Sequence, residues 1–229
     1  MNTVQEIKDA LGRITRGERQ NISLWIAMLA ADRAEDAAVF YDTEPEDSRL
    51  SVEKYLELED EGGLHHEYAD GVIYAMSSPS IAHGLIVGDL HVALYSRLRG
   101  TPCIPYLGNV KVRFKVNHAD VVYCPDLMVA CGRDGAGAQY LRFPKLIIEV
   151  LSPATERIDR CEKLMTYTQL DSVEEYVLVA EDVCEVTVHR REEGWTPQVL
   201  SDPEAVLEFQ SIGLSLPLAR IYERVALEA

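Results

Sequence analysis

The sequence predicts an α/β or α+β domain built on a mixed β-sheet. Segments with helical and strand-like patterns follow one another in the order helix, hairpin, helix, strands, helix, strands. One of them, LIIEVLS at 146–152, has a continuous apolar run, which is typical of a central strand buried on both faces. Helices and strands mixed in this way favour layers of helix on sheet over an all-α or all-β fold.

The N-terminal part is predicted to be a separate helical extension. Apolar residues recur at near-helical spacing over 1–38, and a break near Gly17 predicts two helices. The polar stretch YDTEPEDSRL at 41–50 is typical of a linker. We therefore predict a helical extension over 1–48 and one domain over 49–229.

The domain is predicted to begin with a helix, a hairpin and a longer helix. Ser51 is a reasonable start for the first helix. Asp70-Gly71 lies between two β-prone runs, which is a strong hairpin signal. The longer helix spans about 80–99, and Gly100 ends it.

Strands dominate the rest of the chain. Apolar and polar residues alternate over 110–116, and YCPDLMVAC at 123–131 predicts a second strand before the apolar run at 146–152. The remaining elements are a helix, DRCEKLMTYTQL (159–170), and two strands, EEYVLVA (174–180) and CEVTVHRR (184–191).

Composition is that of an ordinary globular protein. Hydrophobic residues make up 47% and charged residues 26% of the 229 residues. No apolar run approaches the roughly 18 residues of a membrane span, and the first 20 residues lack the apolar core of a secretory signal. The five cysteines are odd in number and lack C-x-x-C spacing, so we expect reduced thiols in a cytoplasmic protein, without a zinc or disulfide framework.

The charge balance restricts the function. The net charge of −16, from 22 basic and 38 acidic residues, argues against broad attraction to nucleic acid but leaves room for a local basic groove. The sequence lacks G-x-S-x-G, P-loop, G-x-G-x-x-G and H-E-x-x-H motifs, which argues against the chemistries that those motifs serve.

Two carboxylates inside apolar runs are the main candidates for chemistry. Asp126 and Glu149 each lie within a predicted strand, where an ionised group is costly unless a partner satisfies it. Two neighbouring carboxylates repel each other, and a divalent cation such as Mg²⁺ would remove that conflict. The alternative is that each caps a strand end or pairs with Arg or Lys.

Lys163 lies 14 residues after Glu149, on the predicted helix. It could orient an attacking water or stabilise charge on a reacting phosphate. The alternative is an ordinary Asp159–Lys163 pair on an exposed helix face. Tyr167 lies on the same face as Lys163, where it would either pack in the core or contact phosphate.

Glu67 and His83 could support a metal through water. Glu67 precedes the predicted hairpin turn, and His83 lies in the following helix. A lone Glu or His in such a place is more often structural, so both readings stay open.

The assembled pattern resembles the Uma family of endonucleases, a branch of the PD-(D/E)XK superfamily. The resemblance covers roughly 50–220 and rests on ADGVIYAMSSPSIAH, CPDLMVA and, above all, EVLSPATERIDRCEKLMTY. It implies a restriction-endonuclease-like core, a mixed sheet flanked by helices. The resemblance also implies that Asp126 is the aspartate of the PD motif and Glu149 the second acidic ligand.

The resemblance assigns three further residues. Leu151 stands where the superfamily has its usual lysine, and in this branch that lysine is moved to the next helix, which maps to Lys163. Glu67 matches an acidic residue of the early motif, and His83 matches the histidine of S-P-x-x-x-H.

These implications give a hypothesis of metal-dependent DNA hydrolysis. Asp126, Glu149 and the carbonyl of Val150 would hold Mg²⁺, with Mn²⁺ as a substitute, and by analogy the protein would be a homodimer. The alternative is a catalytically inactive binding or assembly module with the nuclease fold. Central cations that line one face with Asp126 would favour the nuclease; they are Arg97, Arg99, Lys111, Arg113, Lys115, Arg142 and Lys145.

Overall fold

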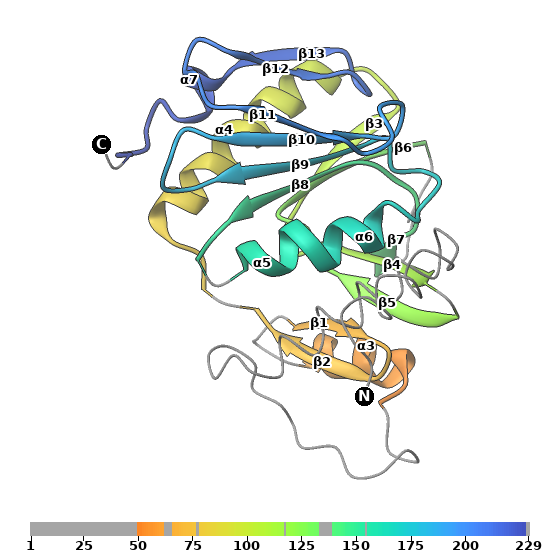
Figure 1. The fold of residues 1–229 in the computed structure, drawn as a ribbon. Coiled ribbons are helices and arrows are strands. Elements are labelled where there is room, and N and C mark those ends of the chain that lie inside the picture. The colour runs from red at the N-terminus through yellow and green to blue at the C-terminus, as the bar shows by residue number, and fades with distance from the viewer. Residues whose placement is uncertain are drawn as a thin grey trace, which may run out of the picture.

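A computed structural model describes residues 50–61, 66–76, 78–116, 118–132, 139–153 and 155–227. The helices predicted over 1–38 lie outside these ranges. In Figure 1, a central sheet is covered by one long helix on its far face and by a second helical segment on its near face. A smaller sheet with its own short helix lies below.

The helices are α3 (Val52–Glu61), α4 (Ile81–Leu98), α5 (Glu156–Ile158), the π-helical segment η2 (Asp159–Lys163), α6 (Leu164–Tyr167) and α7 (Leu218–Ile221). The strands are β1 (His66–Ala69), β2 (Val72–Ala75), β3 (Cys103–Leu107), β4 (Lys111–Val116), β5 (Ala119–Tyr123), β6 (Leu127–Cys131), β7 (Tyr140–Leu141), β8 (Pro144–Leu151), β9 (Glu175–Ala180), β10 (Val186–Arg190), β11 (Pro197–Leu200), β12 (Val206–Phe209) and β13 (Leu214–Pro217).

The central sheet is mixed, as predicted. Its strand order is β11-β10-β9-β8-β6-β3, with β8 parallel to β9 and antiparallel to β6. Parallel strands need a long crossover connection, and here α5, η2 and α6 form it. The apolar run in β8 is central and buried on both faces, which confirms the prediction from its sequence.

Alternate side chains of β8 enter two different cores. Ile148 and Val150 pack in the core that contains α4, whereas Ile147 and Leu151 pack with Tyr167 of α6. This alternation follows from the two-residue period of a strand. It determines which side chains of β8 face the crossover helix.

The smaller sheet positions the hairpin predicted at Asp70-Gly71. Its strand order is β2-β1-β5-β4-β7, and β1 pairs antiparallel with both β2 and β5. Asp70 and Gly71 have φ of 48° and 91°, the left-handed conformation that a tight hairpin turn requires. The hairpin thereby places Glu67 of β1 beside the end of β5.

The predicted helix after Pro79 is also confirmed. The Ser80 side chain accepts a hydrogen bond from the His83 N–H, which caps α4, and Gly100 follows the helix with φ +82°. This cap fixes His83 in the first turn. Neither α4 nor any other helix in the described part of the chain is long and apolar enough to cross a membrane.

The single strand predicted over 123–131 is wrong. The chain forms two strands there, with β5 ending at Tyr123 and β6 beginning at Leu127, and the two belong to different sheets. Pro125 lies in the break and has no N–H to donate to a ladder. Asp126 therefore precedes β6 instead of lying inside a strand.

The expectation that all cysteines are reduced is also wrong. Cys103 of β3 and Cys131 of β6 lie directly opposite each other in the sheet and form a disulfide. Of the three free cysteines, Cys124 is buried, Cys161 is exposed and Cys184 is half-buried. The separation of 28 residues between the bonded cysteines carries no sign of the register that brings them together.

Buried His189 on β10 predicts a pH dependence of stability. Its Nδ1 lies 2.9 Å from the Trp195 carbonyl oxygen. Burial lowers the pKa of His189, and this outweighs the bond to the carbonyl. The folded-state pKa lies below the ordinary value of about 6.5. The contribution of neutral His189 to stability is therefore present above pH ~6.5 and is lost as the pH falls through the folded-state pKa.

The variant His189→Asn tests this source of acid sensitivity, because asparagine keeps a donor near the Nδ1 position. Urea unfolding of both proteins at pH 5 and pH 7 is the measurement. The unfolding free energy of the wild type, relative to the variant, is expected to be larger at pH 7. An equal difference at both pH values would exclude His189 as the source.

Candidate functional site

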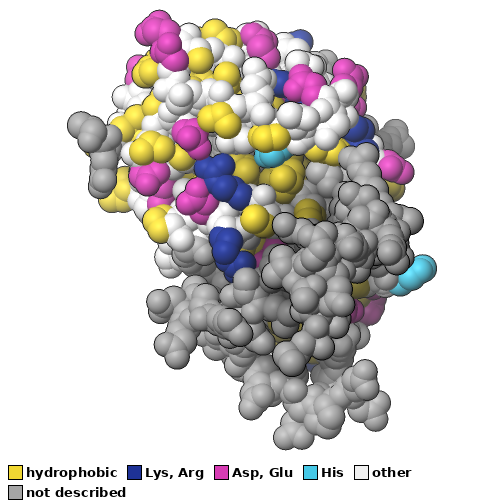
Figure 2. All heavy atoms as spheres, viewed as in Figure 1, with side chains coloured by type: hydrophobic (Ala, Val, Ile, Leu, Met, Phe, Trp, Pro, Cys, Tyr) yellow, Lys and Arg dark blue, Asp and Glu magenta, His cyan; other side chains and the backbone are white. Residues whose placement is uncertain are grey.

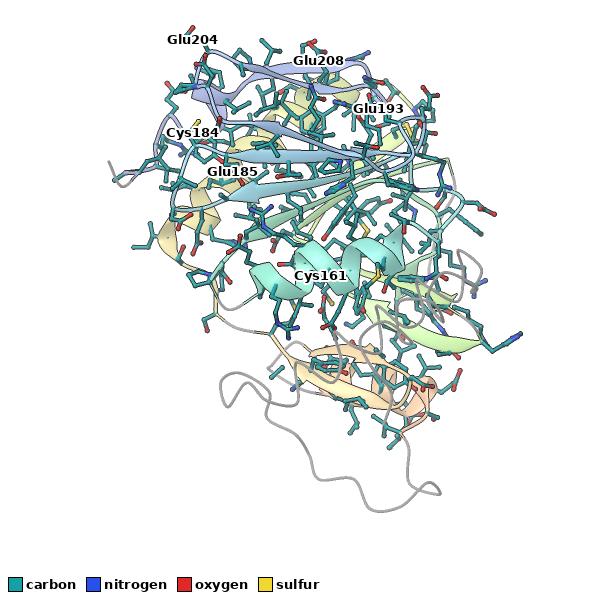
Figure 3. The ribbon with its side chains drawn as sticks, viewed as in Figure 1. Cys161, Cys184, Glu185, Glu193, Glu204 and Glu208 are labelled. Atoms are coloured by element: carbon teal, nitrogen blue, oxygen red, sulfur yellow. A yellow bond between two sulfur atoms is a disulfide. The ribbon has the colours of Figure 1, made fainter. Side chains whose placement is uncertain are left out.

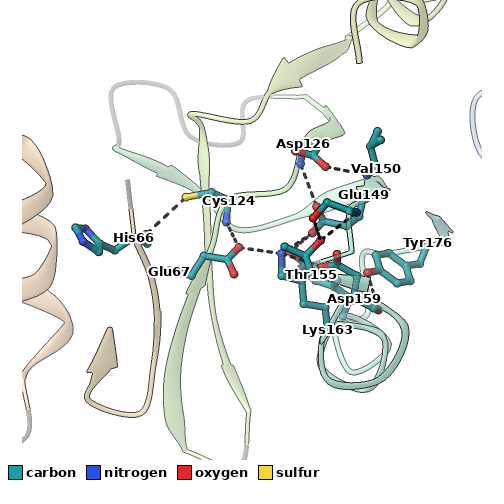
Figure 4. A network of polar contacts seen from close by, with 12 residues as sticks. His66, Glu67, Cys124, Asp126, Glu149, Val150, Thr155, Asp159, Lys163 and Tyr176 are labelled. Atoms are coloured by element: carbon teal, nitrogen blue, oxygen red, sulfur yellow. Dashed lines mark hydrogen bonds and ion pairs between the residues drawn. The ribbon is translucent and has the colours of Figure 1, made fainter. Parts of the chain in front are cut away.

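Strand register brings Asp126 and Glu149 together. Leu127 pairs with Ile148, so the next position along the antiparallel ladder sets Asp126 opposite Glu149. The Asp126 N–H donates to Glu149 Oε2 (3.2 Å), and the Val150 N–H donates to Asp126 Oδ2 (2.8 Å). The two carboxylates of the predicted pair are therefore neighbours (Figure 4).

The side chain of Glu149 points to the crossover helix. It lies between Ile148 and Val150, whose side chains face α4, so it shares the other face of the sheet. It is only 3% exposed. Lys163 Nζ lies 3.1 Å from Glu149 Oε1, and the Tyr167 hydroxyl donates to the same oxygen at 3.3 Å. Lys163 and Tyr167 thus share the face predicted for them.

Lys163 joins three carboxylates from three different elements. Its Nζ lies 3.0 Å from Glu67 of β1, 3.1 Å from Glu149 of β8 and 3.2 Å from Asp159 of η2. Asp159 and Lys163 are 2% and 6% exposed, so the alternative of an ordinary pair on an exposed helix face is excluded. The ammonium also lies over the Tyr123 ring, 5.5 Å from its centroid.

A π-helical turn carries both members of the Asp159–Lys163 pair. The helix widens over η2 and returns to α-helical geometry at Leu164. Single-turn π segments of this kind are rare in proteins, but those that occur often lie at functional sites. Both side chains face the sheet from this turn, and the apolar periodicity of the sequence does not predict its π-helical geometry.

Glu67 and His83 contact different parts of the site. Glu67 Oε1 accepts the Cys124 N–H at 3.0 Å and also contacts Lys163, through which it reaches Glu149. His83 Nε2 lies 3.1 Å from Asp126 Oδ2. The structure therefore brings all the predicted site residues into one network, with Lys163 and Asp126 at its two ends.

The network holds more negative than positive charge. Its four carboxylates, Glu67, Asp126, Glu149 and Asp159, surround one lysine and one histidine. Burial is the largest cause that raises the pKa of Glu149, and the other three carboxylates add to it while Lys163 opposes it. For the Lys163 ammonium, burial acts to lower the pKa, but Glu149, Glu67 and Asp159 together raise it well above its ordinary value.

The pKa of His83 is raised as well. Burial acts against its protonated form, but the hydrogen bond to Asp126 and the charge on that carboxylate outweigh burial. A protonated His83 would donate a charge-assisted hydrogen bond to Asp126. His83 therefore holds the Asp126 side chain in place from the first turn of α4.

The donor set fits a hard divalent cation that keeps most of its waters. Within the described residues, no group of three or more His, Cys, Asp or Glu side chains is arranged to hold a metal ion. Mg²⁺ does not need such a cage, because one or two carboxylates and several waters satisfy it. Asp126 and Glu149, linked through the Asp126 N–H, would supply two carboxylates, and the excess of negative charge in the network favours a cation.

Sequence reasoning missed three residues of the network. Tyr123 lies under the Lys163 ammonium, the Tyr176 hydroxyl donates to the Asp159 carbonyl oxygen at 3.0 Å, and Thr155 bonds the Asp159 side chain. Tyr123 comes three residues before Asp126, which was a usable signal. Nothing in the sequence near Thr155 or Tyr176 sets them apart from ordinary residues of a turn and a strand.

Comparison with protein families decides the family. Residues 52–219 match the Uma2 family, described as "Putative restriction endonuclease". The chain belongs to the Uma2 family. An uncharacterized protein of Synechocystis sp. (strain PCC 6803) is 33% identical over 180 residues, which cover 78% of this chain and 94% of that protein.

A solved structure supports the fold of this Uma2 protein. A "putative nuclease belonging to DUF820" from Anabaena variabilis superposes with a TM-score of 0.64 at 18% identity, covering 76% of this chain and 98% of that one. The likeness confirms the predicted restriction-endonuclease-like core with its mixed sheet. Both relatives are covered almost completely, whereas over a fifth of this chain has no counterpart in them.

Proposed function

We propose that this Uma2 protein is a metal-dependent endonuclease that hydrolyses phosphodiester bonds in DNA. The observation that carries the proposal is the convergence of Asp126, which precedes β6, Glu149 of β8 and Lys163 of η2 on one network. The nuclease description of the family supports a nucleic-acid substrate. The choice of DNA as the nucleic acid and the dependence on a metal are both inferences that belong to this proposal.

We assign Mg²⁺ binding to Asp126, Glu149 and the carbonyl of Val150, with Mn²⁺ as a substitute. The N–H and C=O of one strand residue point to the same side, and the Val150 N–H already faces Asp126. When bound, the ion would polarise the phosphate and lower the pKa of a coordinated water.

The side chains around the ligands have separate roles in the proposal. Lys163 orients the attacking water or neutralises charge that develops on the phosphate. Glu67 and Asp159 hold the Lys163 ammonium in place and keep it charged. His83 positions Asp126, and the Tyr167 hydroxyl positions Glu149 through its hydrogen bond.

Purified protein and a panel of supercoiled and linear DNA test the proposal. With Mg²⁺ or Mn²⁺ the wild type is expected to nick or cut at least one substrate, and chelation of the metal is expected to stop the reaction. If no substrate is cut, or if Asp126→Ala cuts equally well, the proposal fails.

The alternative function, a binding or assembly module without activity, is favoured by the positions of the basic residues. Lys111, Arg113 and Lys115 of β4 pair with carboxylates of the smaller sheet and α3. Lys145 lies four residues before Glu149 on β8 and pairs with Glu174. These four side chains lie on two strands, and each pairs with a carboxylate outside the network of Asp126.

The other three cations do not change this distribution. Arg97 and Arg99 lie at the end of α4 opposite to His83, and Arg142 bonds Tyr140. On the described part of the face in Figure 2, basic and acidic side chains are interspersed without a continuous basic groove. An active enzyme would therefore have to dock DNA mainly through the metal and neutral contacts, or through a basic partner.

Calorimetric titration with Mg²⁺ separates the two functions. The nuclease is expected to bind the ion and to lose that binding in Asp126→Asn, whereas an inactive module need not bind it. A cytoplasmic location stays a prediction, and the Cys103–Cys131 disulfide does not support it, because disulfides are rare in the cytosol.

A further inference from the structure

The outward face of α4 carries apolar side chains that nothing in the described chain covers. Ile81, Val92 and Tyr95 are 86%, 64% and 56% exposed. The opposite face of the helix is fully occupied, because Ile86, Leu90, Leu94 and Leu98 pack into the central core. A helix that is apolar on both faces is normally buried on both.

The three exposed residues, together with half-buried Leu85 and Gly88, follow the spacing of a helix-pairing seam. We define the α4 seam as Ile81, Leu85, Gly88, Val92 and Tyr95, whose successive intervals are 4, 3, 4 and 3 residues. This is the a/d repeat by which two helices pack against each other. The 14 steps from Ile81 to Tyr95 extend about 21 Å along the helix.

The α4 seam is symmetric about Gly88 to within one residue. Ile81 lies seven residues before it and Tyr95 seven after, while Leu85 and Val92 lie three before and four after. An antiparallel copy of α4 would therefore set Ile81 against Tyr95 and Leu85 against Val92, with Gly88 at the two-fold axis. Self-complementarity of this kind defines the interface of a two-fold dimer.

Packing within the chain does not explain the glycine. A Cβ added at Gly88 would meet only the guanidinium of Arg224, at an ordinary contact distance of 3.9 Å. Glycine weakens a helix interior relative to alanine. Close approach of a second backbone is the usual reason to keep a glycine at such a position.

Charge also favours a second copy as the partner. Two chains that each carry a net charge of −16 repel one another, so they must meet through a surface without free acids. The α4 seam contains no charged residue. The one acid of α4, Asp89, is neutralised by Arg224, with contacts of 2.5 and 3.2 Å.

We propose that the α4 seam is the interface of a homodimer in which two α4 helices pack antiparallel across a two-fold axis at Gly88. The interface does not depend on the proposed nuclease activity. Residues 1–49 of the same chain, or an unrelated protein, are the other possible covers of the seam, and each gives a different experimental result.

Analytical ultracentrifugation of the full chain is the first test. The wild type is expected to sediment as a dimer. Val92→Glu is expected to raise the dimer Kd by at least about 100-fold, because it places an unpaired carboxylate against the apolar Leu85 of the second copy. Val199→Glu, at a 55% exposed valine on β11, is the matched control and is expected to leave the Kd unchanged.

Cysteine cross-linking tests the axis itself. Cys161, on the outward side of the crossover helix in Figure 3, is exposed and would react, so the test uses a Cys161→Ser background. Gly88→Cys is expected to form a disulfide-linked dimer on mild oxidation. Tyr95→Cys is not expected to do so, because antiparallel packing keeps the two copies of this position about 20 Å apart.

A monomeric wild type without Gly88→Cys cross-linking would overturn the proposal and would leave residues 1–49 or another protein as the cover. A dimer that Val92→Glu does not weaken would also overturn it, by placing the interface elsewhere. Cross-linking through both positions would contradict the antiparallel arrangement.

Discussion

Asp126→Asn is expected to lower the rate of DNA cleavage by about 10²- to 10³-fold, the range seen when one preorganised electrostatic contact to a reacting group is removed. The fold is expected to survive, because the asparagine oxygen can still accept the Val150 N–H that Asp126 now accepts. The neutral amide cannot supply the negative charge that a divalent cation requires. Cleavage rates at saturating Mg²⁺ are the measurement.

Asp120→Asn is a matched control for this variant. The two aspartates have the same side-chain exposure of 19%, but Asp120 lies on β5 and pairs with Arg113 and Lys115. Its replacement is expected to leave the cleavage rate within a few-fold of the wild type. Equal losses in both variants would assign the effect to general disturbance of the fold instead of to the site.

Lys163→Met is expected to lower the free energy of unfolding by about 3–5 kcal/mol, the range for removal of one partner from a buried ion pair. The ammonium is the common contact of Glu67, Glu149 and Asp159, all of them buried. Methionine fills a similar volume but leaves the carboxylates facing one another. Urea unfolding at pH 7, followed by circular dichroism, measures the loss.

The pH dependence of this loss has a definite sign. Without Lys163, repulsion raises the folded-state pKa of Glu149 further above its unfolded value, since Lys163 now lowers it. A carboxyl group with a raised pKa favours the folded state when it is protonated, and that advantage is lost as the pH rises through the folded-state pKa. The deficit of the variant is therefore expected to shrink from pH 7 to pH 5.

Lys145→Met is the control for the lysine variant. Lys145 is 32% exposed and has one partner, Glu174, at 3.3 Å, so its loss is expected to cost at most about 1 kcal/mol. A Lys163→Met protein as stable as this control would show that the ammonium is not the common counterion of the cluster.

The parts of the site that could be predicted are those with a local pattern. Glu149 stands out as a carboxylate between apolar residues whatever the rest of the fold, because a buried charge costs free energy unless a partner offsets it. Helical spacing correctly put Lys163 and Tyr167 on one face. The hairpin at Asp70-Gly71 and the end of α4 follow from turn and cap chemistry that acts over a few residues.

The missed features depend on contacts between distant segments. The Cys103–Cys131 disulfide exists because β3 and β6 pair in one register, and spacing along the chain does not encode that register. The break at Pro125 separates two sheets, although the apolar pattern around it reads as one strand. The π-helical turn at Asp159–Lys163 has no signature in the apolar periodicity.

A crystal structure determined with Mn²⁺, with the ion located by its anomalous scattering, is the sharpest test of the proposed site. The proposal is that Asp126 and Glu149 form one metal site beside Lys163. We expect an ion bound by carboxylate oxygens of both residues at about 2.0–2.2 Å, a typical distance for a small divalent cation. An ion held elsewhere, or no ion between these residues at saturating Mn²⁺, would contradict it.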